Sequence, residues 1–261
     1  MAIYSDFLKI SANLVAKETR TQFAGSILGR LWWVFGPFLQ MGLYALVFGL
    51  ILKSRPLVGG MEVPYVVYLC TGLLPWTVWS SFLARAPQLF IDNAHYIKKI
   101  RIPKFVFVLQ SAAVAALPFL VTLPLFLGLA LLLGAIPTWF GVLSYVGVTL
   151  MGLALCMGIA MLLAYLNVFL RDVGQLVPFV VQVLFWSLPI CYAQQNITGS
   201  LKEVLQLNPF SGLVNLAHAA FLKGTLSSRD DLLHVAVMMS LSWAIGLFIA
   251  YRTDKWVVDE L

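Results

Sequence analysis

Long runs of apolar residues, separated by short polar stretches, dominate the chain. Six of these runs reach or approach the roughly 20 residues that a helix needs to cross the hydrocarbon core of a bilayer. The fifth run is the shortest and contains two prolines. The pattern predicts an all-α integral membrane protein with six transmembrane helices. The runs are Leu31–Leu52, Pro64–Leu83, Phe105–Leu133, Trp139–Phe169, Leu176–Ala193 and Leu232–Tyr251.

Two stretches outside these runs have a weaker apolar pattern. Within residues 1–30, apolar side chains recur at helical spacing among charged ones, which predicts an amphipathic helix in the cytoplasmic interface. A cytosolic packing helix is the alternative. Residues 194–231 hold two apolar stretches that are too short to cross and are typical of re-entrant or interfacial helices. We therefore expect one transmembrane domain that ends in a cytoplasmic tail, residues 252–261.

Composition and charge support a membrane location. Apolar residues make up 61% of the 261 positions and charged residues 11%, against about 25% charged in soluble domains. The net charge of +6 arises from short basic clusters between the apolar runs, so no nucleic-acid partner is expected. If the N-terminus is cytoplasmic, 12 of the 17 Lys and Arg residues also lie on that side. This bias predicts that both termini are cytoplasmic. The other five are Lys53, Arg55, Lys202, Lys223 and Arg229.

The sequence lacks the residues that catalysis or ion coupling would require. The dipeptide Gly-Lys does not occur, so no P-loop is present to hold ATP phosphates. The six apolar runs contain no acidic residue, which argues against a proton- or ion-coupled transporter. The three histidines are scattered, and Cys70, Cys156 and Cys191 have no metal or redox spacing. We predict no catalytic residue and no metal site, and we expect the energy for transport to come from a partner.

Five stretches occur in a fixed order over nearly the whole chain. They are Thr21–Trp32 followed by Pro37, Thr71–Trp76 with Ser80-Ser81, Asn93–Pro103, Arg171–Gln175 with Pro178, and Leu207–Phe210. Together they resemble the permease subunit of bacterial ABC exporters that move O-antigen, capsular polysaccharide or teichoic acid. Gln22 stands where that family usually has a basic or aromatic residue. Arg171-Asp172-Val173 and Lys98-Lys99 are more similar to the O-antigen and teichoic acid permeases than to those for capsule.

The resemblance implies partners and two further sites. It implies a homodimer in the bacterial inner membrane, paired with two copies of a cytoplasmic ATP-binding subunit. ATP and magnesium would bind to that subunit, so this chain would carry no cofactor. In the family, the loop after the second span carries a coupling helix that docks on the ATPase, here Asn93, Tyr96, Ile97, Lys98 and Lys99. The segment between the last two spans forms outer gate helices, here Asn208, Pro209 and Phe210.

The turn before the first apolar run is a candidate phosphate site. Gly29 permits a sharp turn, and the guanidinium of Arg30 can pair with phosphate at headgroup depth. The family resemblance implies that this turn meets the diphosphate of a polyprenyl-linked glycan, with Arg20 as a weaker candidate. The alternative is that Arg30 only anchors the chain to lipid phosphate.

Aromatic residues are frequent and suggest a conduit for a sugar chain. Sugars stack their apolar faces on aromatic rings, and many weak stacking sites suit a sliding polymer because none forms a deep trap. The residues predicted to line the conduit are Phe35, Tyr44, Phe48, Phe185 and Trp186. For tryptophans near the ends of the apolar runs, an aromatic belt at the membrane interface is the alternative.

These features predict the permease subunit of an ATP-driven exporter of a polyprenyl-diphosphate-linked polysaccharide, most simply O-antigen. The same fold could instead export capsular polysaccharide, teichoic acid, a drug or a lipid. A membrane enzyme that acts on lipid-linked sugars is disfavoured because the chain has no cluster of carboxylates. A passive channel is the remaining alternative.

The charge bias yields a prediction of topology. A cysteine placed at Arg101 should be protected from a membrane-impermeant thiol reagent added outside the cell, whereas one placed at Ser200 should be labelled. Residues 92–104 are expected to be cytoplasmic and residues 194–231 to be outside. Labelling of Arg101→Cys together with protection of Ser200→Cys would contradict the assignment.

Overall fold

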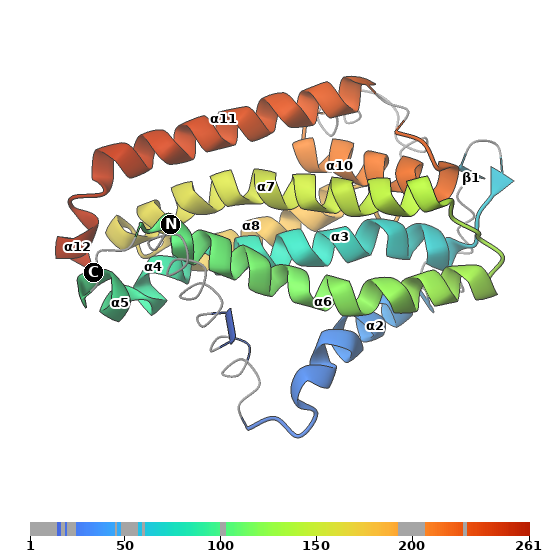
Figure 1. Cartoon of the computed structure of the whole chain (residues 1–261), viewed down its shortest axis with the longest axis horizontal. Coiled ribbons are helices and arrows are strands. Elements are labelled where there is room, and N and C mark those ends of the chain that lie inside the picture. Colours follow the sequence, from blue (N-terminus) through green and yellow to red (C-terminus); the bar gives the residue numbers. More distant parts are fainter. Residues whose placement is uncertain are drawn as a thin grey trace, which may run out of the picture.

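The computed structural model describes residues 15–16, 19, 25–44, 46–47, 57–58, 61–99, 103–192, 207–226 and 229–261. Four long helices run along the long axis of the molecule (Figure 1). They are α3 (Tyr65–Arg85), α6 (Phe105–Leu132), α7 (Trp139–Phe169) and α11 (Arg229–Thr253). Each is long and apolar enough to cross a membrane, α3 together with its continuation to Asp92.

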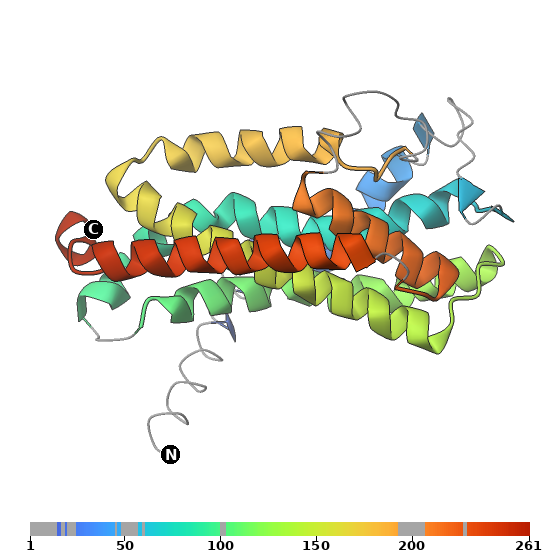
Figure 2. The same ribbon diagram turned by 90° about the horizontal axis from the view of Figure 1, so that it is seen from above.

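Shorter elements join or flank these four helices. At one end of the bundle, α4, α5, α12 and the junction between α7 and α8 lie together (Figures 1 and 2). A small antiparallel hairpin, which pairs Leu57 with Glu62, lies at the other end. The shorter elements are η1 (Gly29–Leu31), α2 (Trp32–Tyr44), β1 (Leu57–Val58), β2 (Met61–Glu62), η3 (Ala86–Gln88), α4 (Leu89–Asp92), α5 (Ala94–Lys99), α8 (Val173–Ser187), α10 (Pro209–His218), η5 (Ala219–Lys223) and α12 (Val257–Glu260).

The predicted all-α membrane fold is confirmed, and four of the six predicted spans coincide with the four long helices. The first and fifth spans are less complete. Helix α2 is α-helical over Trp32–Tyr44, and most of the rest of its predicted range lies outside the described residues. Helix α8 has 15 residues, fewer than a crossing needs. The six-span count therefore stays a prediction, as does the interface helix, since residues 1–30 are largely outside the described part.

Helix α8 ends where proline chemistry requires it to end. Its last residue is Ser187, and Leu188 is extended with ψ 145°. Residue Pro189 follows, and a residue that precedes proline is driven out of the α region by a clash with the proline ring. The predicted fifth span, Leu176–Ala193, ran past this break because hydropathy alone does not detect it. In the structure the helix begins three residues earlier and ends six residues earlier.

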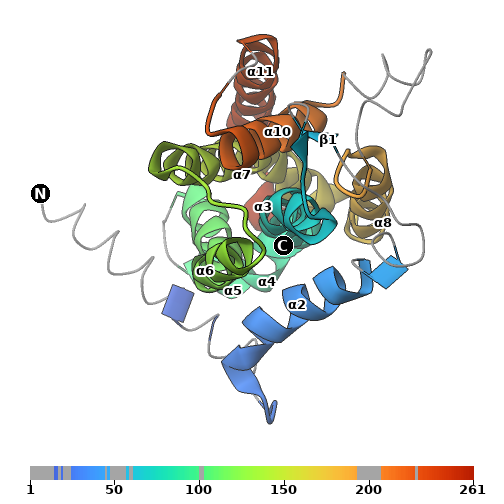
Figure 3. The same cartoon turned by 90° about the vertical axis from the view of Figure 1, so that its right-hand side faces the viewer.

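Helix α3 is the centre of the bundle, with α2, α6, α7, α8 and α10 arranged around it (Figure 3). Its side chains are mostly buried, and Trp79 is completely enclosed. The indole nitrogen of Trp79 donates to the Thr149 carbonyl of α7 over 2.9 Å. A methyl group on Gly152 would lie 2.3 Å from that indole ring, so glycine at this position makes room for Trp79.

Helix α11 lies at the edge of the bundle and packs mainly on α7. The two backbones approach closely at Gly158 and Gly246, where a Cβ on Gly246 would lie 2.7 Å from the Gly158 carbonyl oxygen. Small residues of this kind allow membrane helices to pack by van der Waals contact. Near the same contact, the Trp243 indole nitrogen donates to the Ala154 carbonyl over 2.9 Å. The opposite face of α11 is apolar and exposed, as expected for a surface that meets lipid.

The close contact between α7 and α11 gives a prediction about stability. In Gly158→Ala the new Cβ would lie 2.8 Å from backbone atoms of Ser242 and Trp243, which cannot move aside as a side chain would. We expect a loss of about 2 kcal/mol from overpacking. The matched control is Gly147→Ala on the same helix, where a Cβ meets nothing within 4 Å. Thermal unfolding in detergent should show a lower midpoint for the first variant only. Equal midpoints would contradict the packing described.

Candidate functional site

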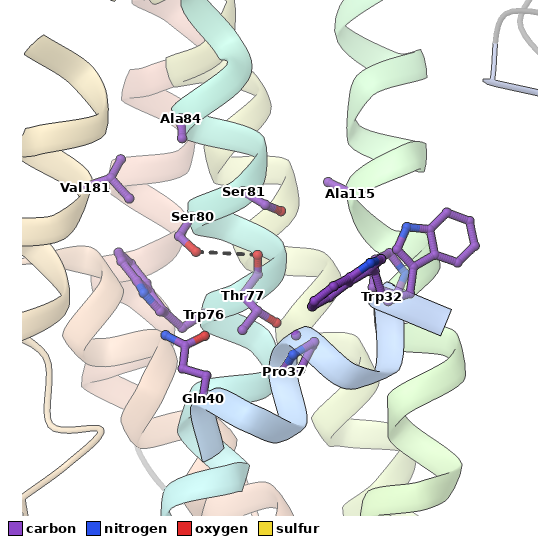
Figure 4. Close-up of a pocket in the computed structure, with 13 residues that line it drawn as sticks. Trp32, Pro37, Gln40, Trp76, Thr77, Ser80, Ser81, Ala84, Ala115 and Val181 are labelled. Atoms are coloured by element: carbon purple, nitrogen blue, oxygen red, sulfur yellow. Dashed lines mark hydrogen bonds between the residues drawn. The ribbon is translucent and has the colours of Figure 1, made fainter. Parts of the chain in front are cut away.

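A cavity of about 520 Å³ lies between α2, α3, α6 and α8 (Figure 4). Cavities of roughly 300–1,000 Å³ are typical of sites for small organic ligands. One wall is α3, and the opposite wall is the first half of α2. Its lining consists of Trp32, Trp33, Gly36, Pro37, Gln40, Trp76, Thr77, Ser80, Ser81, Ala84, Ala115, Pro118 and Val181.

Three hydroxyl groups form a polar stripe on the α3 wall. Thr77, Ser80 and Ser81 fall at i, i+3 and i+4, and helix geometry puts such positions on one face. Each hydroxyl donates its proton to a carbonyl of its own helix, at 2.7 Å, 3.4 Å and 3.1 Å respectively. A hydroxyl oxygen that has donated its proton still has lone pairs that accept. The stripe therefore offers acceptors to the cavity, and the Gln40 amide on α2 adds both a donor and an acceptor (Figure 4).

Three aromatic side chains also line the cavity. Trp32 and Trp33 come from the first turn of α2, and Trp76 from α3. Behind the cavity, the Trp76 ring lies 6.3 Å from Phe185 of α8 and 5.9 Å, edge-on, from Phe210 of α10. Phe185 in turn stacks on Tyr44 of α2 at 5.3 Å. A chain of rings therefore connects α2, α8, α3 and α10.

The lining determines which ligands suit the cavity. None of the described residues that line it carries a charge. Indole faces bind apolar surface, whereas hydroxyl and amide groups exchange hydrogen bonds. A neutral molecule with many hydroxyl groups and some apolar faces, such as a sugar, meets both demands. A phosphate group does not, because nothing in this lining would neutralise it.

Four of the five predicted conduit residues lie in the described part of the chain, and none of these four lines the cavity. Tyr44 and Phe185 stack on each other beside it, and Phe35 and Trp186 are 46% and 56% exposed. Phe48 lies outside the described residues. Their role in a conduit stays a prediction. The sequence reasoning missed Gln40 and Thr77, although the hydroxyl stripe at helical spacing inside an apolar run was a visible signal.

The candidate phosphate turn directly precedes, in the sequence, the first helix that lines the cavity. Gly29 has φ +50°, a left-handed conformation that glycine adopts without strain, and its amide donates to the Ser26 hydroxyl over 3.3 Å. The turn η1 leads directly into Trp32, which lines the cavity. Arg20 and the side chain of Arg30 lie outside the described residues. Their contact with a diphosphate stays a prediction.

The predicted coupling residues, Asn93 to Lys99, form the end of α4 and the short helix α5. The Asn93 side chain donates to the Leu89 carbonyl over 2.9 Å, and the Asn93 carbonyl accepts from the amides of Tyr96 and Ile97. Tyr96 and Ile97 are half-buried against Val106 and Phe107 of α6, so they hold the segment in place. The exposed side chains of α5 are His95, Lys98 and Lys99, a different set from the half-buried apolar pair.

The predicted outer gate residues begin α10. The Asn208 side chain accepts from the Phe210 amide over 3.0 Å and donates to the Ser187 hydroxyl of α8 over 3.3 Å. Pro209 occupies the first turn, where its missing N–H costs nothing.

Helix α10 is buried among α3, α7 and α11. At its end, His218 stacks on Tyr68 at 4.1 Å, with Nε2 3.0 Å from the Tyr68 carbonyl oxygen. Burial lowers the pKa of His218 to about 4, so the ring is neutral at physiological pH. Whether the segment gates a path stays a prediction.

Comparison with known proteins adds evidence from outside the structure. The family model described as ABC-2 type transporter matches residues 12–222. The O-antigen export system permease protein RfbA of Klebsiella pneumoniae is 29% identical over 227 residues, covering 85% of this chain and 82% of that protein. The protein of the same name from Myxococcus xanthus is 28% identical over 248 residues, covering 94% and 92%. The polysialic acid transport protein KpsM of Escherichia coli is 22% identical over 246 residues, covering 93% and 92%.

The cavity gives a prediction about access. A cysteine at Thr77, which lines the cavity, should react with a small methanethiosulfonate reagent. A cysteine at Val78, which is 2% exposed on the same helix, should react at least about tenfold more slowly, because thiol reactivity requires access. The three native cysteines are buried and give a low background. Equal rates for the two variants would show that the cavity is closed.

Proposed function

This chain belongs to the ABC-2 type transporter family, and from that premise we propose that it exports a polyprenyl-diphosphate-linked polysaccharide, with O-antigen as the first candidate. It is the permease subunit and acts in the bacterial inner membrane. Family members of this kind are not enzymes themselves and work with an ATP-binding subunit. In this proposal ATP and magnesium bind to that partner, and this chain supplies the path for the substrate.

The lining of the cavity carries the proposal. It combines three tryptophans with a stripe of hydroxyl groups and an amide, and none of its described residues is charged. Sugar rings present apolar faces to aromatic rings and hydroxyl groups to polar side chains. The diphosphate of the same substrate would remain at the turn formed by Gly29 and Arg30, next to the first lining residue, Trp32. The similarity to O-antigen permeases over most of this chain supports the same substrate class.

The assembly belongs to the same proposal. Helices α2 and α8 lie near each other on one side of the molecule (Figure 3) and expose apolar side chains there. A second copy of the chain would cover such a surface, which supports a homodimer with two ATP-binding subunits. Six crossings and cytoplasmic termini fit the basic bias. The exposed residues are Leu31 at the end of η1, Phe35, Leu39 and Leu43 on α2, and Leu176, Phe179, Val183 and Trp186 on α8.

Two further roles complete this proposal. The exposed His95, Lys98 and Lys99 of α5 provide the surface that contacts the ATP-binding subunit. The start of α10, Asn208 to Phe210, closes the outer end of the path. Export of a capsular polysaccharide is the second candidate, favoured by the similarity to KpsM at lower identity.

A deletion and complementation experiment tests the proposal. Removal of the gene should abolish surface polysaccharide and cause lipid-linked glycan to accumulate inside the cell, and the wild-type chain should reverse both effects. Ala115→Phe, which fills the cavity from α6, should restore about a tenth of wild-type export, equivalent to about 1.4 kcal/mol of lost binding. The matched control is Ala113→Phe, two residues away and exposed.

The outcomes of this experiment separate the substrate from the site. Unchanged surface polysaccharide after deletion would refute the proposed substrate. Full export by Ala115→Phe, at wild-type levels of inserted protein, would remove the cavity from the path. Export is measured as surface polysaccharide per inserted permease, so a variant that inserts poorly is not mistaken for one that transports poorly.

A further inference from the structure

One buried amide side chain joins two segments that are far apart in the sequence. Asn167, in the last turn of α7, is completely buried. Its amide nitrogen donates to the Pro87 carbonyl of η3 over 2.8 Å. Its amide oxygen accepts from the Gly174 backbone amide, in the first turn of α8, over 2.7 Å. Asn167 is thus a bridge between η3 and α8, with both functions of the amide in use.

The bridge is explained by what a helix start needs. The first amides of a helix have no partner within it, and a side chain before the helix usually accepts from one of them. In α8 the preceding residue, Asp172, makes no such side-chain hydrogen bond. The Gly174 amide has two acceptors: the Arg171 carbonyl of its own turn at 3.2 Å and, closer, the Asn167 oxygen from the end of α7 at 2.7 Å. The start of α8 is therefore also held by a side chain that is bound to η3.

Direct packing reinforces the bridge. A Cβ on Gly174 would lie 2.6 Å from the Gln88 side-chain nitrogen of η3 and 3.1 Å from the Asn167 side-chain oxygen. Glycine at this position therefore lets η3 and the start of α8 come into contact. A movement of η3 relative to α7 would have to move α8 or break the Asn167 hydrogen bonds.

The two sides of the bridge lead to different functional regions. On one side, η3 continues directly into α4 and then α5, the segment that we propose contacts the ATP-binding subunit. On the other side, α8 continues for two turns to Val181, which lines the cavity, and then to Phe185, which stacks on Tyr44. One short helix thus connects the bridge to the cavity wall.

The segment η3–α4–α5 packs on α7, whereas α8 is packed on one face only. Phe90 of α4 packs edge-on against Tyr165 of α7 at 4.9 Å. The Tyr165 hydroxyl donates to the Asp254 carboxylate over 2.9 Å, and Lys104, at the start of α6, pairs with the same carboxylate at 2.6 Å. By contrast, most of the outer face of α8 is exposed.

We propose that Asn167 is a positioning residue that transmits movement of the segment η3–α4–α5, residues 86–99, to α8 and so to the cavity wall. This inference rests on the proposed function, because it takes α5 as the contact with the ATP-binding subunit. It requires no change in the fold of either segment. It requires only that η3 and the start of α8 move as one body about the end of α7, which is the shear or hinge motion of packed helices.

The test follows α8 directly, in the complete complex with the ATP-binding subunit in lipid vesicles. A fluorophore is attached to Val180→Cys, an exposed position of α8 that is not among the residues assigned to the surface covered by the second copy, and its signal is recorded before and after addition of ATP and magnesium. We expect an ATP-dependent change that falls about tenfold in Asn167→Ala, the order that two buried hydrogen bonds correspond to. ATP hydrolysis per complex should remain within about twofold of wild type.

Two further variants keep the test decisive. Thr149→Val is the matched control: it removes a buried hydroxyl of α7 that bonds only to its own helix, over 2.9 Å to the Tyr145 carbonyl, and it should leave the signal unchanged. Gly174→Ala places a methyl group between η3 and α8 and should also reduce the signal. It replaces Asn167→Ala in the test if the Asn167→Ala complex does not assemble. An undiminished signal in Asn167→Ala, or in Gly174→Ala where the former does not assemble, would overturn the inference. A proportional loss of signal and ATP hydrolysis would also overturn it, since that is what general destabilisation produces.

Export of lipid-linked O-antigen by the same vesicles is measured in parallel. If wild-type vesicles show the α8 signal but export no O-antigen, the proposed substrate is wrong and the role of Asn167 stands. If they export O-antigen and Asn167→Ala exports as much for each ATP hydrolysed, the role of Asn167 is wrong and the substrate stands.

Discussion

Backbone polar groups that lie in apolar surroundings must find partners inside the protein, because lipid offers none. Regular helices pair these groups along their length, so the groups that still need partners lie mainly where helices break. After α8, the Tyr65 hydroxyl donates to the Cys191 carbonyl and the Tyr68 hydroxyl to the Pro189 carbonyl, each over 3.2 Å. At η3 the Asn167 amide nitrogen donates to the Pro87 carbonyl. Tyr65, Tyr68 and Asn167 are thus buried polar side chains that lie where helix breaks need them.

Two kinds of contact join the described helices. Hydrogen bonds from Trp79, Tyr145 and Trp243 to backbone carbonyls tie α3, α7 and α11 together. Helices α2 and α8 meet α3 through ring contacts and apolar packing in the described residues. The cavity lies between α3 and these two helices, with α6 on its remaining side.

Much of the fold was predictable because hydropathy reports directly on long apolar helices. The predicted span Trp139–Phe169 coincides with α7, and Phe105–Leu133 differs from α6 by one residue. The break after Arg85 and the early end of α8 depend on Pro87 and Pro189, which a hydropathy average does not weigh. The hydroxyl stripe of Thr77, Ser80 and Ser81 is visible in the sequence, but the cavity was not predictable. The cavity arises only where this stripe meets Gln40 of α2, and that meeting depends on packing.

The chain of rings from Tyr44 through Phe185 and Trp76 to Phe210 has a mechanical consequence. Stacked and edge-on rings attract each other through many small contacts, and this attraction changes gradually as one ring slides over another. A hydrogen bond, by contrast, is lost within a fraction of an ångström. The ring contacts of α8 with α2 and with α3, at 5.3 Å and 6.3 Å, can therefore shift without the loss of a hydrogen bond. The hydrogen bonds that oppose such a shift lie at the two ends of α8, where Asn167 accepts from Gly174 and Asn208 donates to Ser187. Helix α8 is thus fixed by polar contacts at its ends and held by adjustable contacts along its middle.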